Sequence, residues 1–415
     1  MNLADFELLL TAAGQELLER LAGGYDESAA LSLSEKLRVE YPPELVATAL
    51  TQSRLRARAA QKFGARAARM YFTGPGYEQA TRSAVAELRA ARYKQADVRR
   101  VADLCCGIGG DALAFAEAGI EVLAVDRDPV TCAVLGENAR VFGLADRIEV
   151  RCADVESVGL DGCDGVFLDP ARRGERGRTF DPEAYSPPWS FAVGLAGGVV
   201  GGLAERVGGR LRAVGFKVAP GLPHELIPAG AQAEWVSDRG EVKEAGIYFG
   251  DVAVGASRQA TLLPGAQRLE SAGVPDPVPG EVGRYLYEPD GAVIRAHLLG
   301  ELAEAMAGGS GEDVGSGEVR TIDPTIAYLT SDAGIDSPFV SGYEVSDVLP
   351  FNMKKLRAVV AERGYGSLTV KKRGADVDPA LLRKQLRPAG PNSAVLIVTR
   401  VGGAHAAIFA QEWGK

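Results

Sequence analysis

Histidine and cysteine are scarce in this chain of 415 residues, and their spacing excludes several kinds of chemistry. The three histidines are isolated in the sequence and form neither a catalytic triad nor a metal-binding pattern. The five cysteines include no Cys-x-x-Cys pair, which argues against a zinc site and a disulfide framework. The N-terminus lacks the basic start of a secretory signal, and no apolar run reaches the roughly 20 residues of a membrane span. We therefore expect a cytoplasmic protein that has no metal and no contact with membranes.

The composition is that of an ordinary globular protein, but the charge is unevenly distributed. Hydrophobic residues make up 46% and charged residues 24%, and a chain of this length is expected to form two or three domains. The net charge of −9 argues against a protein that wraps nucleic acid over its whole surface. However, ten basic residues outnumber three acidic ones between Lys354 and Arg387, and eight outnumber two between Lys36 and Arg69. Either segment alone is typical of a solvated helix face, but together they favour a polyanionic substrate.

A glycine-rich loop, Asp103–Asp111, lies between a strand-like run that ends at Leu104 and a helix-like run that begins at Ala112. Glycine lets the backbone approach a ligand closely, and the N-terminus of the following helix offers free N–H groups. The loop therefore indicates a site for a nucleoside cofactor. The glycines alone do not identify that cofactor, because Gly107, Gly109 and Ala112 also fit the dinucleotide pattern Gly-x-Gly-x-x-Ala.

Carboxylates follow three further strand-like runs. They are Asp126 after residues 122–125, Asp154 after residues 148–152, and Asp169 after residues 165–168. Any one of these acids, taken alone, is typical of a helix cap or a turn. Parallel strands place their carboxyl ends at one edge of a sheet, so acids at four successive strand ends, Asp103 included, predict one ligand-binding crevice.

The glycine loop and this series of acids resemble those of the class I S-adenosylmethionine-dependent methyltransferases, and they fit that family better than a dehydrogenase. The resemblance covers residues 70–255 and implies a Rossmann-like α/β core that binds S-adenosyl-L-methionine. It implies that Asp103 helps to hold the amino group of the cofactor, that Asp126 binds the ribose and that Asp154 contacts the adenine. The residues expected to bind the cofactor are Asp103, Cys105, Gly107, Gly109, Asp126, Arg127 and Asp154.

The same resemblance assigns the chemistry to the fourth strand end, Asp169-Pro170-Ala171-Arg172. In amine-modifying relatives, the acid and a proline carbonyl of this tetrad accept hydrogen bonds from the target N–H group, and an aromatic side chain stacks on the base. Asp169, Pro170 and Arg172 are the expected catalytic residues. Arg172 departs from the family pattern because it replaces the aromatic residue, and its guanidinium group can instead lie on a base or hold a phosphate.

Candidate substrate-binding residues lie downstream of this tetrad. The loop Ser186–Trp189 resembles the Ser-Pro-Pro-Trp of cap-guanosine hypermethylases, whose tryptophan stacks on guanine. Tyr185 and Trp189 are therefore candidates to contact the base, and the alternative for Trp189 is packing in the core. Lys217, near the end of the next strand, either faces the pocket or keeps its head group in solvent. Because no cysteine follows Cys163, methylation of carbon through a cysteine adduct is disfavoured and a nitrogen target is preferred.

The patterning divides the chain into a helical N-terminal domain (1–95), the Rossmann-like domain (96–255), a connecting region (256–319) and a small C-terminal α/β domain (320–415). Apolar residues between Phe6 and Leu21 form one helical face, and Pro43–Phe63 is expected to be a second helix. The segment Met70–Thr81 places aromatic residues around a Gly-Pro-Gly turn. This segment either covers the cofactor pocket or joins two domains.

The C-terminal part alternates strand-like and helix-like runs from Phe339 to Gln411. It resembles the THUMP-like domain of one group of bacterial class I methyltransferases, a domain named for its similarity to a tRNA-binding module, and the whole chain is similar to members of that group. Lys371, Lys372 and Arg373 are expected to bind the substrate. These observations predict a methyltransferase that modifies a base nitrogen of tRNA or rRNA. The alternatives are a small-molecule or protein methyltransferase, and a noncatalytic RNA-binding protein that retains the cofactor fold.

Overall fold

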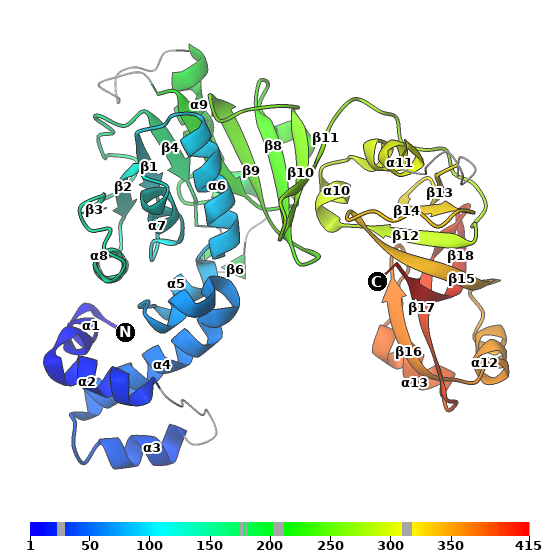
Figure 1. Ribbon diagram of the computed structural model, residues 1–415, viewed down its shortest axis with the longest axis horizontal. Helices are drawn as coiled ribbons and strands as arrows, with labels where there is room; N and C mark the ends of the chain where they lie inside the picture. The colour runs from blue at the N-terminus through cyan, green and yellow to red at the C-terminus, as the bar shows by residue number, and fades with distance from the viewer. Residues whose placement is uncertain are drawn as a thin grey trace. The chain divides into compact units, whose positions relative to one another are not determined.

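The computed structural model describes residues 1–22, 30–171, 173–174, 177–178, 181–201, 211–308 and 318–414 (Figure 1). The chain divides into two compact units. The first consists of Met1–Gln232 and Glu244–Val254, and the second consists of Ala233–Lys243 and Gly255–Lys415.

Helices form the beginning of the first unit. They are α1 (Leu3–Leu10), α2 (Ala12–Leu21), α3 (Ala30–Leu37), α4 (Pro43–Phe63), a 3₁₀ turn (Gly64–Ala68), α5 (Gly74–Gln79) and α6 (Ser83–Gln95). The helix predicted over Pro43–Phe63 has these bounds. The single apolar helical face from Phe6 to Leu21 is wrong, because Thr11 ends α1 and caps α2. Its hydroxyl group donates to the Leu8 carbonyl at 2.7 Å and accepts the Gly14 N–H at 3.2 Å.

A mainly parallel sheet occupies the rest of the first unit. Six of the nine strands of this sheet concern the site, namely β1 (Arg100–Leu104), β2 (Glu121–Asp126), β3 (Ile148–Cys152), β4 (Gly165–Leu168), β7 (Ala213–Val218) and β9 (Glu241–Gly250). They lie in the order β9-β7-β4-β1-β2-β3, and only the pair β7–β9 is antiparallel. The helices α7 (Gly110–Glu117), α8 (Pro129–Val141) and α9 (Trp189–Gly201) alternate with these strands, and β5 (Arg173–Gly174) pairs with β6 (Gly177–Arg178). β4 and β7 are buried along their whole length, and Lys217 of β7 is their only charged residue, as expected for strands covered on both faces.

One apolar core joins the N-terminal helices to this sheet. Phe6, Leu45 and Phe72 belong to the same buried cluster as Phe115 of α7 and Phe167 of β4. Helices α6 and α7 pack side by side (Figure 1). The N-terminal helices are therefore part of the body that positions the strand ends.

The second unit contains another sheet. Its strands are β12 (Tyr285–Pro289), β13 (Arg320–Asp323), β14 (Ile326–Ser331), β15 (Val340–Pro350), β16 (Tyr365–Lys372), β17 (Asn392–Val401) and β18 (Ala404–Trp413). Their order is β13-β14-β12-β15-β18-β17-β16, which places β16 at an edge, parallel to β17. Helices α12 (Met353–Glu362) and α13 (Pro379–Leu386) pack against β16.

Regular elements also fill much of the region that the sequence suggested was a connection. β8 (Gln232–Asp238) pairs with β10 (Arg258–Leu263), and β10 pairs with β11 (Gln267–Glu270). Helices α10 (Gly291–Arg295) and α11 (Leu299–Gly308) follow β12. Residues 256–308 thus contribute strands and helices to the second unit.

Candidate cofactor and active site

A cavity of about 560 Å³ lies at the carboxyl ends of β1, β2, β3, β4 and β7. The predicted site residues that line it are Asp103, Cys105, Gly107, Asp126, Arg127, Asp154, Asp169, Pro170 and Lys217. Gly109, Tyr185 and Trp189 are not among the lining residues. Lys371, Lys372 and Arg373 belong to the second unit. Arg172 lies outside the described residues, so its role stays a prediction.

The loop after β1 turns through three residues with left-handed backbone, Cys105 (φ 61°), Gly107 (φ 55°) and Gly109 (φ 94°). A Cβ atom at Gly109, the residue before α7, would lie 2.2 Å from the Leu135 side chain. Glycine is therefore required there both by the backbone conformation and by the close packing of α8. Gly109 does not line the cavity, but it helps to fix the conformation of the loop that does.

Asp103 is a buried carboxylate whose hydrogen-bonding capacity is not used. It is 1% exposed, and neither of its oxygens has a hydrogen-bond partner among the described residues. Burial, followed by repulsion from Asp111 and Asp169, raises the pKa of Asp103 well above its usual range. A buried polar group without a partner is unfavourable, so Asp103 is suited to a ligand that brings N–H donors.

Asp126 and Asp154 extend the cavity along β2 and β3. Asp126 Oδ2 accepts the Gly107 N–H at 3.1 Å and Oδ1 accepts the Asp128 N–H at 3.0 Å, which fixes the carboxylate. Each oxygen retains a lone pair for a hydroxyl donor. Asp154 is exposed, and its Oδ1 accepts the Glu156 N–H at 2.9 Å.

Asp169 and Lys217 meet because their strands are neighbours. Leu168 of β4 lies opposite Phe216 of β7, so the next residue of each strand reaches the same edge. Lys217 is 6% exposed, and its Nζ donates to Asp169 Oδ2 at 2.6 Å. Burial lowers the pKa of Lys217, but Asp169, Glu244 and Asp111 outweigh it and raise the pKa above its usual value. Of the two alternatives for this lysine, the structure shows the one that faces the pocket.

The residues of the loop after Asp169 that line the cavity are not the expected aromatic residues. Ser186 and Pro187 line the cavity, and Ser186 exchanges backbone hydrogen bonds with Ala171 at 2.9 and 3.0 Å. Tyr185 is 4% exposed, and the half-buried Trp189 packs edge-on against Phe216 with 6.0 Å between ring centroids. Contact of Tyr185 and Trp189 with a base therefore stays a prediction.

The segment Met70–Thr81 covers the cavity, since Pro75, Gly76 and residues 78–81 form part of its wall. Lys62 of α4 fixes this wall by donating to the carbonyls of Tyr77, Glu78 and Ala80 at 2.7, 2.9 and 3.2 Å. A Cβ atom at Gly76 would lie 2.4 Å from Ile108, which shows how closely this wall approaches the glycine loop.

Four further residues complete the site, and the sequence analysis gave them no role. Thr81 Oγ1 donates to Asp111 Oδ2 at 2.7 Å, and Lys217 Nζ donates to Thr81 Oγ1 at 3.0 Å. Arg89, which is 2% exposed, forms ion pairs with both Asp111 and Glu244. Only Asp111 could have been identified from its sequence neighbourhood, because it lies in the first turn of the helix after the glycines.

The cavity is strongly acidic. Of the residues that the structure describes, eight carboxylates and two cations, Arg127 and Lys217, line it. This charge favours a cationic ligand and disfavours a dinucleotide, whose pyrophosphate is anionic.

Among the described residues, no group of three or more His, Cys, Asp or Glu side chains is arranged to hold a metal ion. In the same part of the chain, every helix is too short or too polar to cross a membrane.

A largely parallel α/β sheet, a glycine loop and acids at successive strand ends define a Rossmann-like nucleoside-binding protein. The particular family follows from comparison with known proteins. The chain is 32% identical over 370 residues to an uncharacterized S-adenosylmethionine-dependent methyltransferase of Mycobacterium tuberculosis (strain H37Rv), and the match covers 87% of this chain and 93% of the relative. The chain therefore belongs to the S-adenosylmethionine-dependent methyltransferases.

Other comparisons agree with this assignment. Residues 98–191 match the family described as RNA cap guanine-N2 methyltransferase, residues 340–412 match the THUMP domain-like family, and residues 2–59 match a domain of unknown function. A putative methyltransferase from Porphyromonas gingivalis W83 has the same fold, with 18% identity, a TM-score of 0.66 and coverage of 94% of this chain and 100% of that one. A 23S rRNA (uracil(1939)-C(5))-methyltransferase of Shewanella amazonensis is 39% identical over 80 residues, which is 18% of each chain. The predicted Rossmann-like core, cofactor and THUMP-like domain are confirmed.

Proposed function

We propose that this methyltransferase modifies a base nitrogen of RNA, with tRNA and rRNA as the candidate substrates. The observation that carries the proposal is the Asp169 carboxylate, which stands at the cavity edge with one oxygen held by Lys217. Asp169 and the Pro170 carbonyl are proposed to accept hydrogen bonds from the target N–H group. Asp169 also lies within the residues that match the RNA cap guanine-N2 methyltransferase family.

The cavity fits S-adenosyl-L-methionine, whose sulfonium and amino groups are both cationic. The unpartnered oxygens of Asp103 suit the amino group, and the lone pairs left on Asp126 suit the ribose hydroxyls. Asp154 is proposed to contact the adenine, and Arg127 to close the wall beside Asp126. Cys105, Gly107 and Gly109 are proposed to serve cofactor binding by shaping the loop, so that the ligand can approach the backbone.

Transfer to nitrogen is an in-line displacement. The target nitrogen uses its lone pair to form the N–CH₃ bond while the CH₃–S bond breaks and its electrons return to sulfur, and an N–H proton then leaves to water. The protein mainly has to aim that lone pair, because alignment of the reacting atoms supplies much of the rate. A carboxylate that accepts the N–H is suited to this task.

A carbon target is disfavoured by the state of the nearby thiols. The relative from Shewanella is named for C5 of uracil, and such chemistry uses a thiolate that attacks the base. Cys105 and Cys106 line the cavity, but burial and the surrounding carboxylates raise the pKa of both thiols. No cysteine follows Cys163 in the sequence. A nitrogen nucleophile that comes from the substrate is therefore the better proposal.

Many cations of the two basic segments are engaged within the protein. In the first unit, Arg58 and Lys62 lie over the Tyr77 ring, and Arg66 and Arg69 lie over the Phe142 ring. In the second unit, Lys371 Nζ pairs with Glu288 at 2.6 Å and Arg373 pairs with the same carboxylate at 3.2 Å. Contact of Lys371, Lys372 and Arg373 with RNA thus stays a prediction, and Lys372 is the exposed member of the three.

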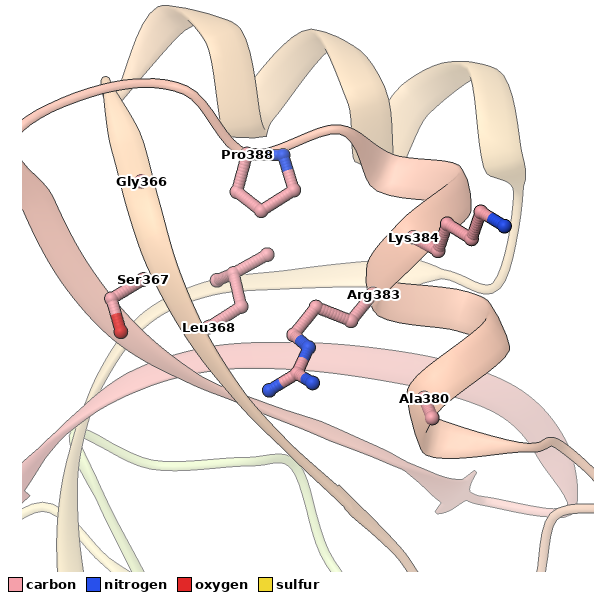
Figure 2. A pocket seen from close by; sticks show the side chains of 7 residues that line it. All are labelled: Gly366, Ser367, Leu368, Ala380, Arg383, Lys384 and Pro388. Atoms are coloured by element: carbon pink, nitrogen blue, oxygen red, sulfur yellow. The ribbon is translucent and has the colours of Figure 1, made fainter.

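Of the remaining cations of the C-terminal segment, Arg357 donates to the Gln385 carbonyl and Arg363 pairs with Asp347, both at 3.0 Å. The other six are exposed and have no ion-pair or side-chain hydrogen-bond partner among the described residues. They are Lys354, Lys355, Lys372, Arg383, Lys384 and Arg387. Two of them line a groove of about 550 Å³ between β16 and α13, and none of the described residues that line this groove is acidic. Figure 2 shows Arg383 extending from α13 towards β16, while Lys384 points away from the strand. We propose that this groove holds RNA phosphates, because unpaired cations are available to replace released counterions.

Substitution of Asp169 tests the catalytic proposal. Asp169→Ala should abolish methylation of RNA from cells that lack the gene, while the Kd for S-adenosyl-L-methionine stays close to that of the wild type. Asp146→Ala, which removes an exposed aspartate outside the cavity, is the matched control. Mass spectrometry of nucleosides from cells with and without the gene identifies the base. Wild-type turnover by Asp169→Ala would remove this residue from its role, and methylation of protein or small molecules alone would refute the RNA substrate.

The groove is tested by the salt dependence of RNA binding. Arg383→Ala/Lys384→Ala should weaken binding and reduce the slope of log K against log salt by roughly 1–2, the contribution of two phosphate contacts. Arg239→Ala/Arg268→Ala removes the same charge from exposed positions outside the groove and should change the slope less. Equal slopes for the two double variants would place the phosphates elsewhere.

A further inference from the structure

Lys217 carries a buried positive charge beside the carboxylate that the proposed function requires. Its Nζ donates to Asp169 Oδ2 at 2.6 Å and to Thr81 Oγ1 at 3.0 Å. Removing an ammonium group from water is unfavourable, and a buried ion pair is weak grounds for stability. A buried lysine at the wall of an active-site cavity therefore indicates a role in the reaction.

The hydroxyl group of Thr81 fixes the direction in which Lys217 is held. It has one proton, and it donates that proton to Asp111 Oδ2 at 2.7 Å, because the carboxylate can only accept. The remaining lone pairs of Oγ1 are then left for the Lys217 ammonium group. The hydroxyl thus links a carboxylate on one side to an ammonium group on the other.

Asp111 is itself anchored by a buried cation. Arg89 of α6 forms ion pairs with Asp111 of α7 and with Glu244 of β9, and its guanidinium lies 4.1 Å from the centroid of the Phe167 ring. Burial lowers the pKa of Arg89, but the two carboxylates outweigh it and raise the pKa. Three elements of the first unit therefore hold the acceptor to which Thr81 points.

This network makes the two oxygens of the Asp169 carboxylate different. Oδ2 accepts the Lys217 hydrogen bond, whereas Oδ1 makes no hydrogen bond with the described residues, and the side chain is 23% exposed. One oxygen is therefore held inside and the other is left for a ligand. Without Lys217, rotation of the carboxylate would exchange the two.

We propose that Lys217 is a positioning residue, held by Thr81, that turns the Asp169 carboxylate so that Oδ1 accepts the hydrogen bond of the target N–H group. This inference rests on the proposed function of Asp169. It gives Lys217 a task that does not require direct contact with the substrate. It also makes the last residue of the covering segment part of the catalytic arrangement, because Thr81 ends the stretch that begins at Met70.

Thr81 offers the mildest test, because valine keeps its shape and serine keeps its hydroxyl group. Thr81→Val should lower kcat by roughly five- to tenfold, the effect of one lost hydrogen bond, while the KM for RNA and the Kd for cofactor change by less than about twofold. Thr81→Ser should recover most of the rate. Thr51→Val is the matched control, because the exposed Thr51 hydroxyl group donates a hydrogen bond only to the Ala47 carbonyl of its own helix.

A double-mutant cycle separates positioning from substrate contact. Lys217→Met should lower kcat at least as much as Thr81→Val, and adding Thr81→Val to Lys217→Met should have no further effect, because both act through one contact. Additive losses, equal rates for the valine and serine variants, or a rise in the KM for RNA at unchanged kcat would overturn the positioning role. If Asp169→Ala retains full turnover, or if the wild type methylates no RNA, the proposed function itself fails. If only the Thr81 and Lys217 effects are absent, the positioning role alone fails.

Discussion

Replacing Asp103 with asparagine removes one negative charge from the cavity and leaves the shape of the side chain almost unchanged. Neither carboxylate oxygen has a hydrogen-bond partner among the described residues, and the residue is 1% exposed. We propose that the amino group of the cofactor supplies the missing donor. The substitution therefore removes a charge-assisted hydrogen bond from the complex and breaks none that the structure shows in the free protein.

The size of the effect follows from the distance and the surroundings. Two unit charges roughly 4 Å apart interact with about 4 kcal/mol at an effective dielectric constant of about 20. The asparagine carbonyl still accepts a hydrogen bond, which restores roughly 1 kcal/mol. We expect S-adenosyl-L-methionine to bind about 2–4 kcal/mol more weakly, which raises its Kd roughly 30- to 1000-fold.

Isothermal titration calorimetry measures this change, and a truncated ligand provides the control. 5′-Methylthioadenosine lacks the amino-acid end, so it should bind the wild type and Asp103→Asn with the same Kd. An equal loss for both ligands would show that the substitution disturbs the whole cavity. A Kd for S-adenosyl-L-methionine within about threefold of the wild type would refute the contact with the amino group.

The pH dependence gives an independent check of the same residue. The pKa of Asp103 is raised by burial and by the nearby Asp111 and Asp169, so a proton must leave before the cationic ligand is bound. Affinity should rise with pH from about 4, the usual carboxyl pKa, by at most about tenfold per pH unit, and the asparagine variant should lack this rise. The free protein should show the opposite sign. Its folded state holds the proton more tightly than the unfolded chain, so its stability should fall as pH rises through this window.

Three further substitutions test other parts of the site. Asp126→Ala should raise the cofactor Kd roughly tenfold or more in calorimetry, because the ribose hydroxyls and the Gly107 N–H lose their acceptor; an unchanged Kd contradicts the assignment. Arg89→Met removes the ion-pair partner of two buried carboxylates and should lower the free energy of unfolding in urea by about 3–5 kcal/mol. A loss below about 1 kcal/mol would mean that other groups satisfy these carboxylates. Gly109→Ala places alanine at a φ of 94° against Leu135 and should cost about 1–3 kcal/mol by the same measurement, with wild-type stability as the opposing result.

The strand ends of the first unit could be predicted because their sequence features are local. Each apolar run is short and ends in an acid, and parallel strands bring such ends together whatever the details of packing. The break at Thr11 was missed because the apolar spacing continues across it, and only the hydroxyl cap and the missing side chain of Gly14 turn the chain. β11 was missed because it is short and Leu269 is its only apolar residue, so no alternation is visible.

The network behind Asp169 could not be predicted, because its members lie far apart in the sequence. Arg89 and Glu244 are 155 residues apart, and Thr81 and Lys217 are 136 apart. Patterns within one helix or strand cannot show that residues so far apart in the sequence are in contact. The same limit applies to the ion pairs of Lys371 and Arg373, since their partner Glu288 is more than 80 residues away.

The way the helical segment closes the cavity has a consequence for any attempt to transplant this enzyme's chemistry. Gly76 belongs to the wall, Lys62 holds the wall through hydrogen bonds, and the N-terminal helices share one apolar core with the sheet. A fragment that begins at residue 96 would lose the segment that covers the cavity and would expose Phe115 and its apolar neighbours to water. Swapping the sheet between homologues therefore requires carrying its first 95 residues along as well.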